Sequence, residues 1–263
     1  MRKHPILAIA LAAALSANAG FAANLQGLGD GCDGRPDVLI GQDDDNVNNP
    51  IIQIVEAPPN QSLDNADMLD GRGGCDVLIG LSGDDVIEGG PGNDITIGGV
   101  EQFDPEGFGN RDIIRGGLGN DTNIWAPGDG SDLFVGGDGK QDAQVFGVID
   151  IDEFNVPVLS PTFGQFVRTG IPTADVTGSP GFCVLEDVRN TGLGFDFLVR
   201  FFVRSTDSLA VTIRLVDVEQ VFCTSEGGGA VIYADLTADV PQFIEVSLQE
   251  VEDLNRTVSR IIR

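Results

Sequence analysis

The chain has 263 residues and is strongly acidic, with 41 Asp and Glu residues against 15 Lys and Arg and a formal net charge of −26. Phosphate binding needs a basic face, so this balance argues against a nucleic-acid partner and favours cations. Solubility alone is the other explanation for so many acids. The only histidine is His4. The rest of the chain therefore cannot use Ser–His–Asp or Cys–His catalysis, or bind a metal through histidine.

The first 22 residues have the layout of a secretory signal peptide. Arg2 and Lys3 form a basic start, residues 6–15 are apolar, and small residues at 17–22 offer cleavage sites. The apolar stretch is too short to span a bilayer, and a retained membrane anchor is the alternative. We therefore expect export to the periplasm, the cell surface or the medium, with no transmembrane segment after cleavage.

Export would place the four cysteines in an oxidising compartment, where disulfides persist. We expect Cys32–Cys75 and Cys183–Cys223, because each pair then stays within one compositional half of the chain. Free thiols are the alternative. A zinc site is less favoured, because no two cysteines are spaced as a chelating pair.

An aspartate recurs every nine residues in the first half of the chain. The series contains Asp67, Asp76, Asp85, Asp94, Asp112 and Asp121, and it continues with looser spacing at Asp132 and Asp142. The six residues that end at each aspartate are rich in glycine, as in "GGPGND" (89–94), which indicates turns with positive φ or close backbone approach. The residues that follow are apolar and alternate, which is typical of short strands.

Strands this short are not stable alone, so we expect them to stack in a coil with a continuous core. Two nonapeptides would form one 18-residue turn, with loops on alternate sides. The residues expected to point inward are Val77, Ile79, Val86, Ile95, Ile97, Ile113 and Leu133. The predicted fold class is thus all-β, and a disordered Gly/Asp-rich segment is the alternative.

Stacking would bring backbone carbonyls and aspartate carboxylates of successive loops together as an all-oxygen site. Ca²⁺ accepts such ligands, whereas Mg²⁺ demands a smaller octahedral geometry and gives up water reluctantly. Without a cation the stacked carboxylates would repel one another. We therefore expect several Ca²⁺ ions to bind, and their binding to be coupled to folding.

The repeat resembles the RTX, or hemolysin-type, calcium-binding nonapeptide GGxGxDxUx, in which U is a large apolar residue. "GGPGNDITI" (89–97) carries its three glycines and its aspartate, and "GGLGNDTNI" (116–124) does so with Asn123 at U. "GLSGDDVIE" (80–88) and "GRGGCDVLI" (71–79) lack the second glycine. The resemblance covers residues 71–142, and it implies a parallel β-roll, a right-handed β-solenoid of nonapeptide repeats.

In this family the aspartate side chain and the carbonyls of the first and third loop residues bind Ca²⁺. The resemblance therefore implies side-chain ligands at Asp76, Asp85, Asp94, Asp112, Asp121 and Asp132, and carbonyl ligands at Gly71, Gly73, Gly80, Ser82, Gly89, Pro91, Gly116 and Leu118.

The 18-residue spacing predicts which loops stack. Loop 71–76 should lie against loop 89–94, and loop 89–94 against residues 107–112. The stretch "GGVEQF" (98–103) has Phe103 where an aspartate is expected. This departure leaves the stacking partners of loops 80–85 and 116–121 open.

The second half lacks the repeat and predicts a different structure. Residues 195–204 and 209–222 alternate as strands, and 181–188 is a further strand candidate. Residues 246–262 place apolar side chains at helical spacing, which predicts a terminal helix. We read this half as a β-rich cap that protects the last edge of the roll, and an independent ligand-binding sandwich is the alternative.

These features divide the chain into three expected parts. Residues 1–22 are the signal peptide, residues 23–147 the calcium-binding β-roll with an insertion at about 42–62, and residues 148–263 the β-rich capping or binding domain with its C-terminal helix.

The predicted function is that of a secreted calcium-binding repeat protein with a structural, adhesive or interaction role. Its expected partners are Ca²⁺ ions, and a cell-surface glycan or protein partner is left open. The alternatives are a Ca²⁺-dependent extracellular enzyme acting on polysaccharide, and a glycan- or protein-binding module in residues 148–263. The enzyme is less favoured and no catalytic residue is predicted, because no acid stands in a context that singles it out.

Overall fold

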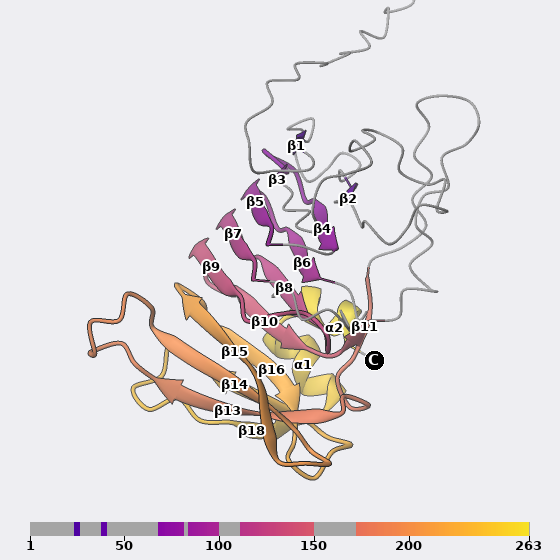
Figure 1. Cartoon of the computed structure of the whole chain (residues 1–263), viewed down its shortest axis with the longest axis vertical. Helices are drawn as coiled ribbons and strands as arrows, with labels where there is room; N and C mark the ends of the chain where they lie inside the picture. Colours follow the sequence, from indigo (N-terminus) through magenta and orange to yellow (C-terminus); the bar gives the residue numbers. More distant parts are fainter. Residues whose placement is uncertain are drawn as a thin grey trace, which may run out of the picture.

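The computed structural model describes residues 24–26, 38–40, 68–81, 84–99, 111–149 and 172–262. The described chain is predominantly β-sheet with two short helices, so the all-β fold class is confirmed (Figure 1). The predicted signal peptide, the predicted insertion at 42–62 and Ser82 lie outside these residues.

Two sheets of eight strands each make up most of the described chain. In spatial order, sheet A contains β1 (Asn24–Gln26), β3 (Met68–Asp70), β5 (Val86–Pro91), β7 (Ile113–Leu118), β9 (Leu133–Asp138), β15 (Ser208–Val216), β14 (Phe197–Val203) and β13 (Gly181–Asp187). Sheet B contains β18 (Ile244–Val246), β17 (Val231–Asp235), β16 (Gln220–Thr224), β10 (Ala143–Phe146), β8 (Thr122–Trp125), β6 (Ile95–Gly99), β4 (Val77–Leu81) and β2 (Val38–Ile40). A separate antiparallel pair consists of β11 (Val148–Ile149) and β12 (Ala174–Asp175).

From β1 to β10 the described strands alternate between the two sheets, odd-numbered in sheet A and even-numbered in sheet B. Neighbouring strands within each sheet are parallel, so strands of successive turns lie side by side. Glycine-rich loops connect β5 to β6, β7 to β8 and β9 to β10. This arrangement stacks the loops as well as the strands, and it therefore brings their aspartates together.

The second half continues both sheets. Strand β15 pairs in parallel with β9, and β16 pairs in parallel with β10. Beyond these two strands each sheet becomes antiparallel, through β14 and β13 in sheet A and through β17 and β18 in sheet B. The predicted strands at 181–188, 195–204 and 209–222 are confirmed, and the last of these is divided into β15 and β16.

The hydrophobic core between the sheets uses different residues from those predicted in sheet A. Ile87, Ile114 and Phe134 are fully buried there, together with Leu69 and Leu78. The predicted inward residues Val86, Ile113 and Leu133 each precede one of these positions, and Ile113 is 36% exposed. The prediction was wrong by one residue, because successive strand residues face opposite sides and the pattern alone does not identify the inner side.

The predicted residues of sheet B are buried, but on its other face. Val77, Ile79, Ile95 and Ile97 belong to a second cluster that includes Val251, Val258 and Ile261 of the two C-terminal helices. These are α1 (Leu248–Leu254) and α2 (Arg256–Ile261), which lie against sheet B in Figure 1. Because both faces of sheet B are covered, strands β6, β8 and β10 are buried along their whole length.

The C-terminal segment forms two helices where one was predicted. Asn255 separates them in an extended conformation, and its side-chain oxygen accepts hydrogen bonds from the backbone N–H groups of Thr257 and Val258. Its amide group donates to the carbonyl of Gln141 and to Oε1 of Gln220. These four bonds satisfy the buried amide and anchor the helix pair beside the loops. Neither helix has the length and apolar composition needed to cross a membrane.

A row of polar side chains crosses the inner face of sheet B. Thr96 Oγ1 donates to Asn123 Oδ1, and Asn123 Nδ2 donates to Gln144 Oε1, both at 2.9 Å. All three side chains are at most 1% exposed. Thr96 and Asn123 occupy the position where the RTX pattern has a large apolar residue. Their mutual hydrogen bonds satisfy polar groups that would otherwise be buried without partners.

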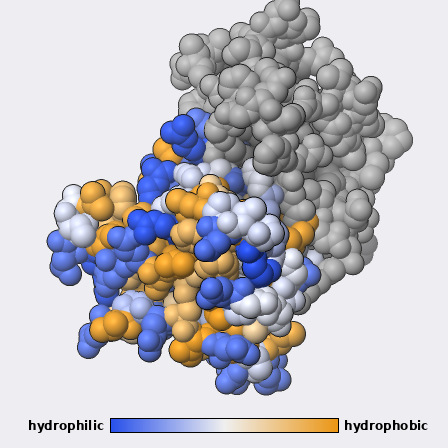
Figure 2. Space-filling model, turned by 60° about the horizontal axis from the view of Figure 1, so that its bottom comes forward, coloured by the Kyte–Doolittle hydropathy of each residue, from blue (hydrophilic) through white to orange (hydrophobic). Residues whose placement is uncertain are grey.

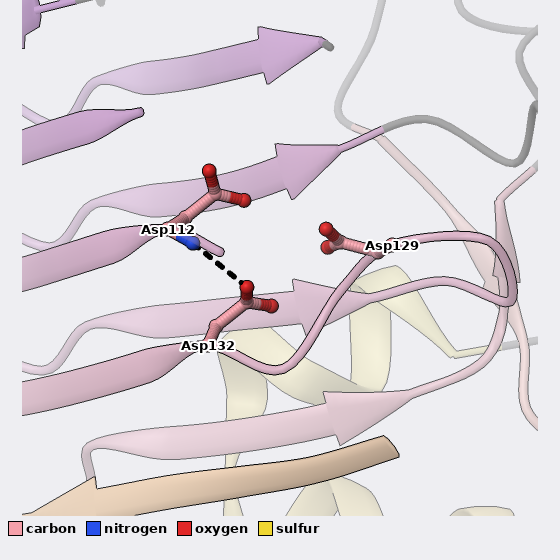
Figure 3. Close-up of side chains that lie close together, drawn as sticks. All are labelled: Asp112, Asp129 and Asp132. Atoms are coloured by element: carbon pink, nitrogen blue, oxygen red, sulfur yellow. Dashed lines mark hydrogen bonds between the residues drawn. The ribbon is translucent and has the colours of Figure 1, made fainter. Parts of the chain in front are cut away.

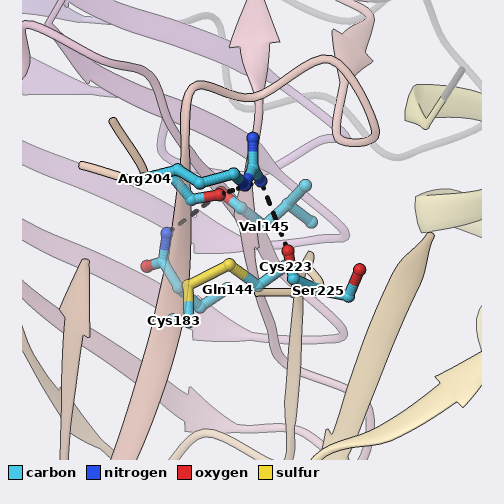
Figure 4. The surroundings of a disulfide bond; sticks show 7 residues. Gln144, Val145, Cys183, Arg204, Cys223 and Ser225 are labelled. Carbon is cyan, nitrogen blue, oxygen red and sulfur yellow. Dashed lines mark hydrogen bonds between the residues drawn. A yellow bond between two sulfur atoms is a disulfide. The ribbon is translucent and has the colours of Figure 1, made fainter. Parts of the chain in front are cut away.

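A disulfide bond joins the two sheets in the second half. Cys183 of β13 is bonded to Cys223 of β16, as predicted from the sequence (Figure 4). Nearby, Arg204 donates hydrogen bonds to the carbonyl oxygens of Ser179, Gly181, Ser225 and Glu226. Cys75 is also disulfide-bonded, and its predicted partner Cys32 lies outside the described residues.

The exposed large apolar side chains of the described chain lie mainly in the second half. They are Val184, Leu193, Leu209, Val240, Ile244 and Leu248, with Ile113 and Leu118 in the first half. Figure 2 shows apolar patches interspersed with hydrophilic side chains on one face of the molecule. Scattered apolar side chains are ordinary on protein surfaces, so they identify no docking surface on this face.

Candidate metal centre

The phased aspartates form two columns. The first column contains Asp85, Asp112 and Asp132, which precede strands β5, β7 and β9 of sheet A; the second contains Asp76, Asp94, Asp121 and Asp142, which precede β4, β6, β8 and β10 of sheet B. All seven side chains are at most 1% exposed. Carboxylates are rarely buried to this extent without compensating partners, so each column requires an explanation.

Each column is held together by one carboxylate oxygen of each aspartate after its first. The backbone N–H of Asp94 donates to Asp121 Oδ1 at 2.8 Å, and that of Asp121 donates to Asp142 Oδ1 at 2.7 Å. The first column has the same bonds, from Asp85 to Asp112 and from Asp112 to Asp132. Each aspartate after the first therefore fixes the backbone of the preceding loop in its column.

In three of the loops the residue before the aspartate makes a bond in the opposite direction. The N–H of Asn120 donates to Oδ1 of Asn93, and the N–H of Gln141 donates to Oδ1 of Asn120. Similarly, the N–H of Arg111 donates to Oδ1 of Asp84. Two stacked loops are thus joined by a reciprocal pair of side-chain-to-backbone hydrogen bonds.

The other carboxylate oxygen is left without a donor. Among the described residues, no hydrogen-bond partner contacts Oδ2 of Asp94, Asp112, Asp121, Asp132 or Asp142. A buried, ionised oxygen without a partner is costly. A bound cation would remove that cost, and the unpartnered oxygens identify where it would have to lie.

Carbonyl oxygens of the next loop lie close to these carboxylates. A Cβ atom added to Gly89 would lie 2.5 Å from Asp94 Oδ2 and 2.6 Å from the carbonyl oxygen of Gly116. At Gly80 the corresponding distances are 2.1 Å to Asp85 Oδ2 and 2.4 Å to the carbonyl oxygen of Gly98. Each first glycine therefore leaves open a space that a carboxylate and a carbonyl oxygen both approach. These are the ligand types that Ca²⁺ takes, so the residues fit a hard cation.

Further glycines are required by the close stacking of the loops. Gly117 and Gly119 have φ of +113° and +135°, a region that favours glycine. A Cβ on Gly119 would lie only 1.4 Å from the carbonyl oxygen of Gly92. In loop 71–76 the position that stacks on Gly90 is Arg72, which adopts φ of +69° despite its side chain.

Burial makes the second column reluctant to ionise. It raises the pKa of Asp94 to about 7 and that of Asp121 to about 8. The hydrogen bond from the backbone N–H of the preceding aspartate in the column lowers each pKa, and the negative charges of neighbouring aspartates raise it. A cation between the loops would counteract both effects that raise the pKa, namely burial and the negative charges of neighbouring aspartates.

Three aspartates of the first column's last turn form a group that could hold a metal ion. One carboxylate oxygen from each of Asp112, Asp129 and Asp132 lies within 4.8 Å of the others. Figure 3 shows Asp129, from the loop between β8 and β9, facing the other two side chains. All three are at most 3% exposed, and the described chain offers no hydrogen-bond partner to their Oδ2 atoms.

Burial and mutual repulsion raise the pKa of all three carboxyl groups well above the usual value. Arg214 provides a nearby positive charge that lowers the pKa of Asp132. Its Nη2 donates to the carbonyl of Ser131 at 2.7 Å, and its Nε donates to the carbonyl of Asp132. Arg214 therefore leaves the Oδ2 atoms of the three aspartates without a hydrogen-bond donor from the described chain.

Asp129 was missed by the sequence interpretation. It is the third residue of the loop "PGDGSD" (127–132), a position from which the RTX pattern uses only the carbonyl. The signal available was a second aspartate in the same loop. The loop is held by a hydrogen bond from Trp125 Nε1 to the carbonyl of Gly130 and by one from the Gly130 N–H to Asp129 Oδ1.

The predicted carbonyl ligands take up varied positions. The Gly89 and Gly116 carbonyls approach the spaces at Gly71 and Gly89, respectively. The carbonyls of Pro91 and Leu118 accept hydrogen bonds from the N–H groups of Gly74 and Gly92, respectively. Each of these oxygens retains one lone pair. The predicted ligands Gly71 and Gly73 lie in loop 71–76, where the Gly71 carbonyl accepts from the Gly73 N–H. Gly80 lies in β4 beside Asp85 Oδ2, and Ser82 lies outside the described residues.

One of the two predicted loop pairs is wrong. Loop 71–76 does stack on loop 89–94, through the bond from Asp76 N–H to Asp94 Oδ1. Loop 89–94, however, stacks on loop 116–121 and not on residues 107–112, whose Asp112 instead accepts from the N–H of Asp85. The separation is 27 residues, because β5 pairs directly with β7 and β6 directly with β8. A skipped nonapeptide preserves the phase of the repeat, so the spacing alone could not reveal it.

Comparisons of the chain with family models, with curated proteins and with solved structures find no match. Interpretation of the site therefore depends on its geometry and on the residues described above.

Proposed function

We propose that the chain is an exported calcium-binding repeat protein with Ca²⁺-dependent folding and a structural or interaction role. In this proposal strands β1–β10, within the region predicted at residues 23–147, form a parallel β-roll of the RTX kind, with Ca²⁺ ions between stacked loops. Three features support the roll: the alternation of strands between sheets, their parallel pairing and the stacked glycine loops.

The observation that supports the proposal most directly is that the two oxygens of each carboxylate have different surroundings. In Asp94, Asp121 and Asp142, Oδ1 holds the neighbouring loop while Oδ2 is buried without a partner in the described chain. A site that served only to stack loops would need only the first oxygen. The second oxygen, with a carbonyl beside it, is arranged for a cation.

Calcium suits these sites better than magnesium. The donors are carboxylate and backbone carbonyl oxygens in loops whose spacing varies from 18 to 27 residues. Ca²⁺ tolerates irregular coordination by 6–8 oxygens, roughly, whereas Mg²⁺ requires near-ideal octahedral geometry. The bound ions would supply positive charge between rows of aspartates, and no catalytic role is assigned to them.

A calcium titration of the full chain tests the proposal. Metal is removed with a chelator, and thermal denaturation and far-UV circular dichroism are then recorded with increasing Ca²⁺ and, separately, Mg²⁺. A ligand at about 100 times its Kd stabilises the folded state by about 2.7 kcal/mol per site. We expect a large rise in Tm and in β-sheet signal with Ca²⁺ and a small one with Mg²⁺. An equal Tm in chelator and in Ca²⁺ would contradict the proposal.

Export is proposed from residues 1–22, whose basic start, apolar stretch and small residues are typical of a signal peptide. Expression of the full chain in a secreting bacterial host, followed by mass measurement of the exported product, tests this point. We expect cleavage after one of the small residues at 17–22. A full-length product retained in the cytoplasm would contradict it.

A further inference from the structure

The second column of aspartates continues beyond the repeat. The backbone N–H of Asp142 donates to Oε2 of Glu219 at 2.9 Å, just as the N–H of Asp121 donates to Asp142 Oδ1 at 2.7 Å. Glu219 lies in the short connection between β15 and β16, in the second half of the chain. A glutamate outside the repeat thus occupies the place of the next aspartate.

The backbone around Glu219 repeats the pattern of the loops. In the repeat, the residue after each aspartate donates its N–H to the carbonyl of the preceding aspartate: Thr122 to Asp94, and Ala143 to Asp121. Gln220, which follows Glu219, donates to the carbonyl of Asp142 in the same way at 3.0 Å. The match therefore includes backbone as well as side chain.

The carbonyl of Asp217 takes the place of the next loop's first glycine. A Cβ on Gly136 would lie 2.8 Å from Asp142 Oδ2 and 2.1 Å from the Asp217 carbonyl oxygen. This is the same pair of oxygens that surrounds Gly89 in the repeat. Asp217 adopts φ of +50°, which is uncommon for a residue with a side chain, and its N–H donates to Oδ2 of Asp196.

An unpartnered oxygen points to a ligand here. Asp142 is fully buried, and its Oδ2 has no hydrogen-bond partner in the described part of the chain. None of the ion pairs between described residues involves Asp142, Asp217 or Glu219. Burial raises the pKa of Asp142 to about 7, with the negative charges of Glu219 and Asp217 acting in the same direction.

The two columns end differently. The first ends beside Arg214, which donates to backbone carbonyls of the last loop and places its positive charge near Asp132. The second ends on Glu219, which adds a negative charge to the column. If the end of a column needed only its negative charge reduced, a positively charged side chain would suffice, as Arg214 provides at the end of the first column. The second instead presents another carboxylate.

We propose that Asp142, Glu219 and the carbonyl oxygen of Asp217 form a Ca²⁺ site shared between the repeat and the second half of the chain. The proposal rests on the proposed function, since it extends the same kind of site beyond the repeat. Two carboxylates and a carbonyl are ligands suited to Ca²⁺, and water can complete the coordination. An ion at this site joins the loop between β9 and β10 to the connection between β15 and β16. Calcium would then stabilise the second half as well as the repeat.

The test uses the full chain and the variant Glu219→Gln, which keeps an oxygen for the Asp142 N–H but removes the charge. Glu245→Gln, at an exposed position of β18, is the matched control. Isothermal titration with Ca²⁺ gives the number and affinity of sites. Amide hydrogen exchange reports the protection of β16 with and without Ca²⁺.

We expect Glu219→Gln to bind one Ca²⁺ ion fewer than wild type, or to bind one ion about tenfold more weakly or worse. It should also lose the Ca²⁺-dependent protection of β16, while the Glu245→Gln variant behaves as wild type. An unchanged number of sites, unchanged affinity and unchanged protection would overturn the shared site. Wild-type protein that binds no Ca²⁺ would instead overturn the proposed function and the shared site together.

A second variant covers the case in which Glu219→Gln fails to fold. Glu219→Asp keeps the charge but withdraws the carboxylate by one methylene. We expect weaker binding at one site and unchanged binding at the others. Affinities equal to wild type at every site would again overturn the proposal.

Discussion

The backbone N–H of Asp94 donates a hydrogen bond to Oδ1 of Asp121, and Oδ2 of the same Asp121 carboxylate has no partner among the described residues. One side chain thus performs two separable tasks. Its first oxygen fixes the loop of the preceding turn, and its second is available to a cation. Substitutions that affect only one oxygen, or only the charge, can distinguish these tasks.

Replacing Asp94 by asparagine should have opposite effects with and without calcium. The asparagine side chain keeps an oxygen for the N–H of Asp76, but the substitution removes a buried negative charge. At pH 8, above the pKa of about 7 of Asp94, we expect the metal-free variant to be more stable than wild type by about 1–3 kcal/mol, because an uncompensated buried charge has been removed. In Ca²⁺ the variant should gain less stability than wild type. Denaturant unfolding in chelator and in Ca²⁺ measures both effects.

Asp239→Asn is the matched control for this experiment, since Asp239 is exposed in a turn of the second half. It should leave the stability within about 0.5 kcal/mol of wild type in both conditions. A metal-free Asp94→Asn protein that is less stable than wild type would show that the charge itself is needed for stacking.

Replacing Asp129 by asparagine should remove one cation site and leave the second column intact. Asp129 contributes one of three buried carboxylates to the group with Asp112 and Asp132. We expect a Ca²⁺ titration to lose one site or to show one site weakened about tenfold. Asp138→Asn, an exposed position at the end of β9, should retain all sites. Unchanged binding in the Asp129→Asn variant would remove that residue from the site.

The metal-free protein should lose stability as pH rises. Folding raises the pKa of Asp94, Asp121 and Asp142 to about 7, 8 and 7, whereas the unfolded chain has values near the ordinary one of about 3.9. Between these values the folded state binds more protons than the unfolded state, so the free energy of unfolding falls with pH. The contribution is complete below about pH 4 and is lost as pH rises through 7–8.

Unfolding by denaturant at pH 5, 6.5 and 8 measures this dependence, on protein freed of metal by chelation and desalting. Excess Ca²⁺ should reverse the trend, because cation binding requires ionised carboxylates. Metal-free stability that rises from pH 5 to pH 8 would contradict the raised pKa values.

Replacing Gly119 by alanine should disrupt the stacking of the second column. The added Cβ would lie 1.4 Å from the carbonyl oxygen of Gly92, and φ at this residue is +135°. We expect a loss of about 3 kcal/mol or more, because the backbone of one loop must move. Gly227→Ala is the control, since a Cβ there meets no atom within 4 Å. Similar stability of the two variants would show that the loops are not packed as described.

Removing the disulfide between Cys183 and Cys223 should destabilise the chain without affecting calcium binding. The bond closes a segment with a sequence separation of 40 residues and joins β13 to β16. Loop-closure entropy predicts a loss of about 3–4 kcal/mol for a double alanine variant. The control is Val184→Ala, an exposed position of β13. Equal melting temperatures of the double variant and the control would contradict a stabilising role.

The sequence predicted the columns because the same residue types recur at a regular spacing. Glycines and aspartates at fixed positions identified the loops, and the apolar residues between them identified strands. The phase could not reveal the 27-residue offset between Asp94 and Asp121, since any multiple of nine preserves it. Nor could alternation show that Ile87, and not Val86, faces the other sheet, because both sides of a strand look alike in sequence.

The remaining differences depend on contacts between distant segments. The helix break at Asn255 is stabilised by Gln141 and Gln220, which lie 114 and 35 residues away. Helical spacing of apolar residues continues through the break, so the pattern predicted one helix. Glu219 was missed for a similar reason: it lies outside the repeat, and only the folded chain brings it beside Asp142. Asp129 lies within a repeat loop and was missed because the RTX pattern uses only the carbonyl of that loop position.

The reciprocal bonds between stacked loops have a consequence for the length of the protein. Where the pair is complete, a loop gives its aspartate N–H to the following loop and receives the N–H of the residue before that loop's aspartate, as in Asp94 and Asn120. Two such loops therefore present matching donors and acceptors. Whole turns could be added or removed, and the joint would re-form with the same bonds. Extra residues can be absorbed within a loop, since the same bond forms across 20 residues between Asp112 and Asp132 and across 21 between Asp121 and Asp142. The stack is extensible in steps of a turn, and its size can change without redesign of any loop.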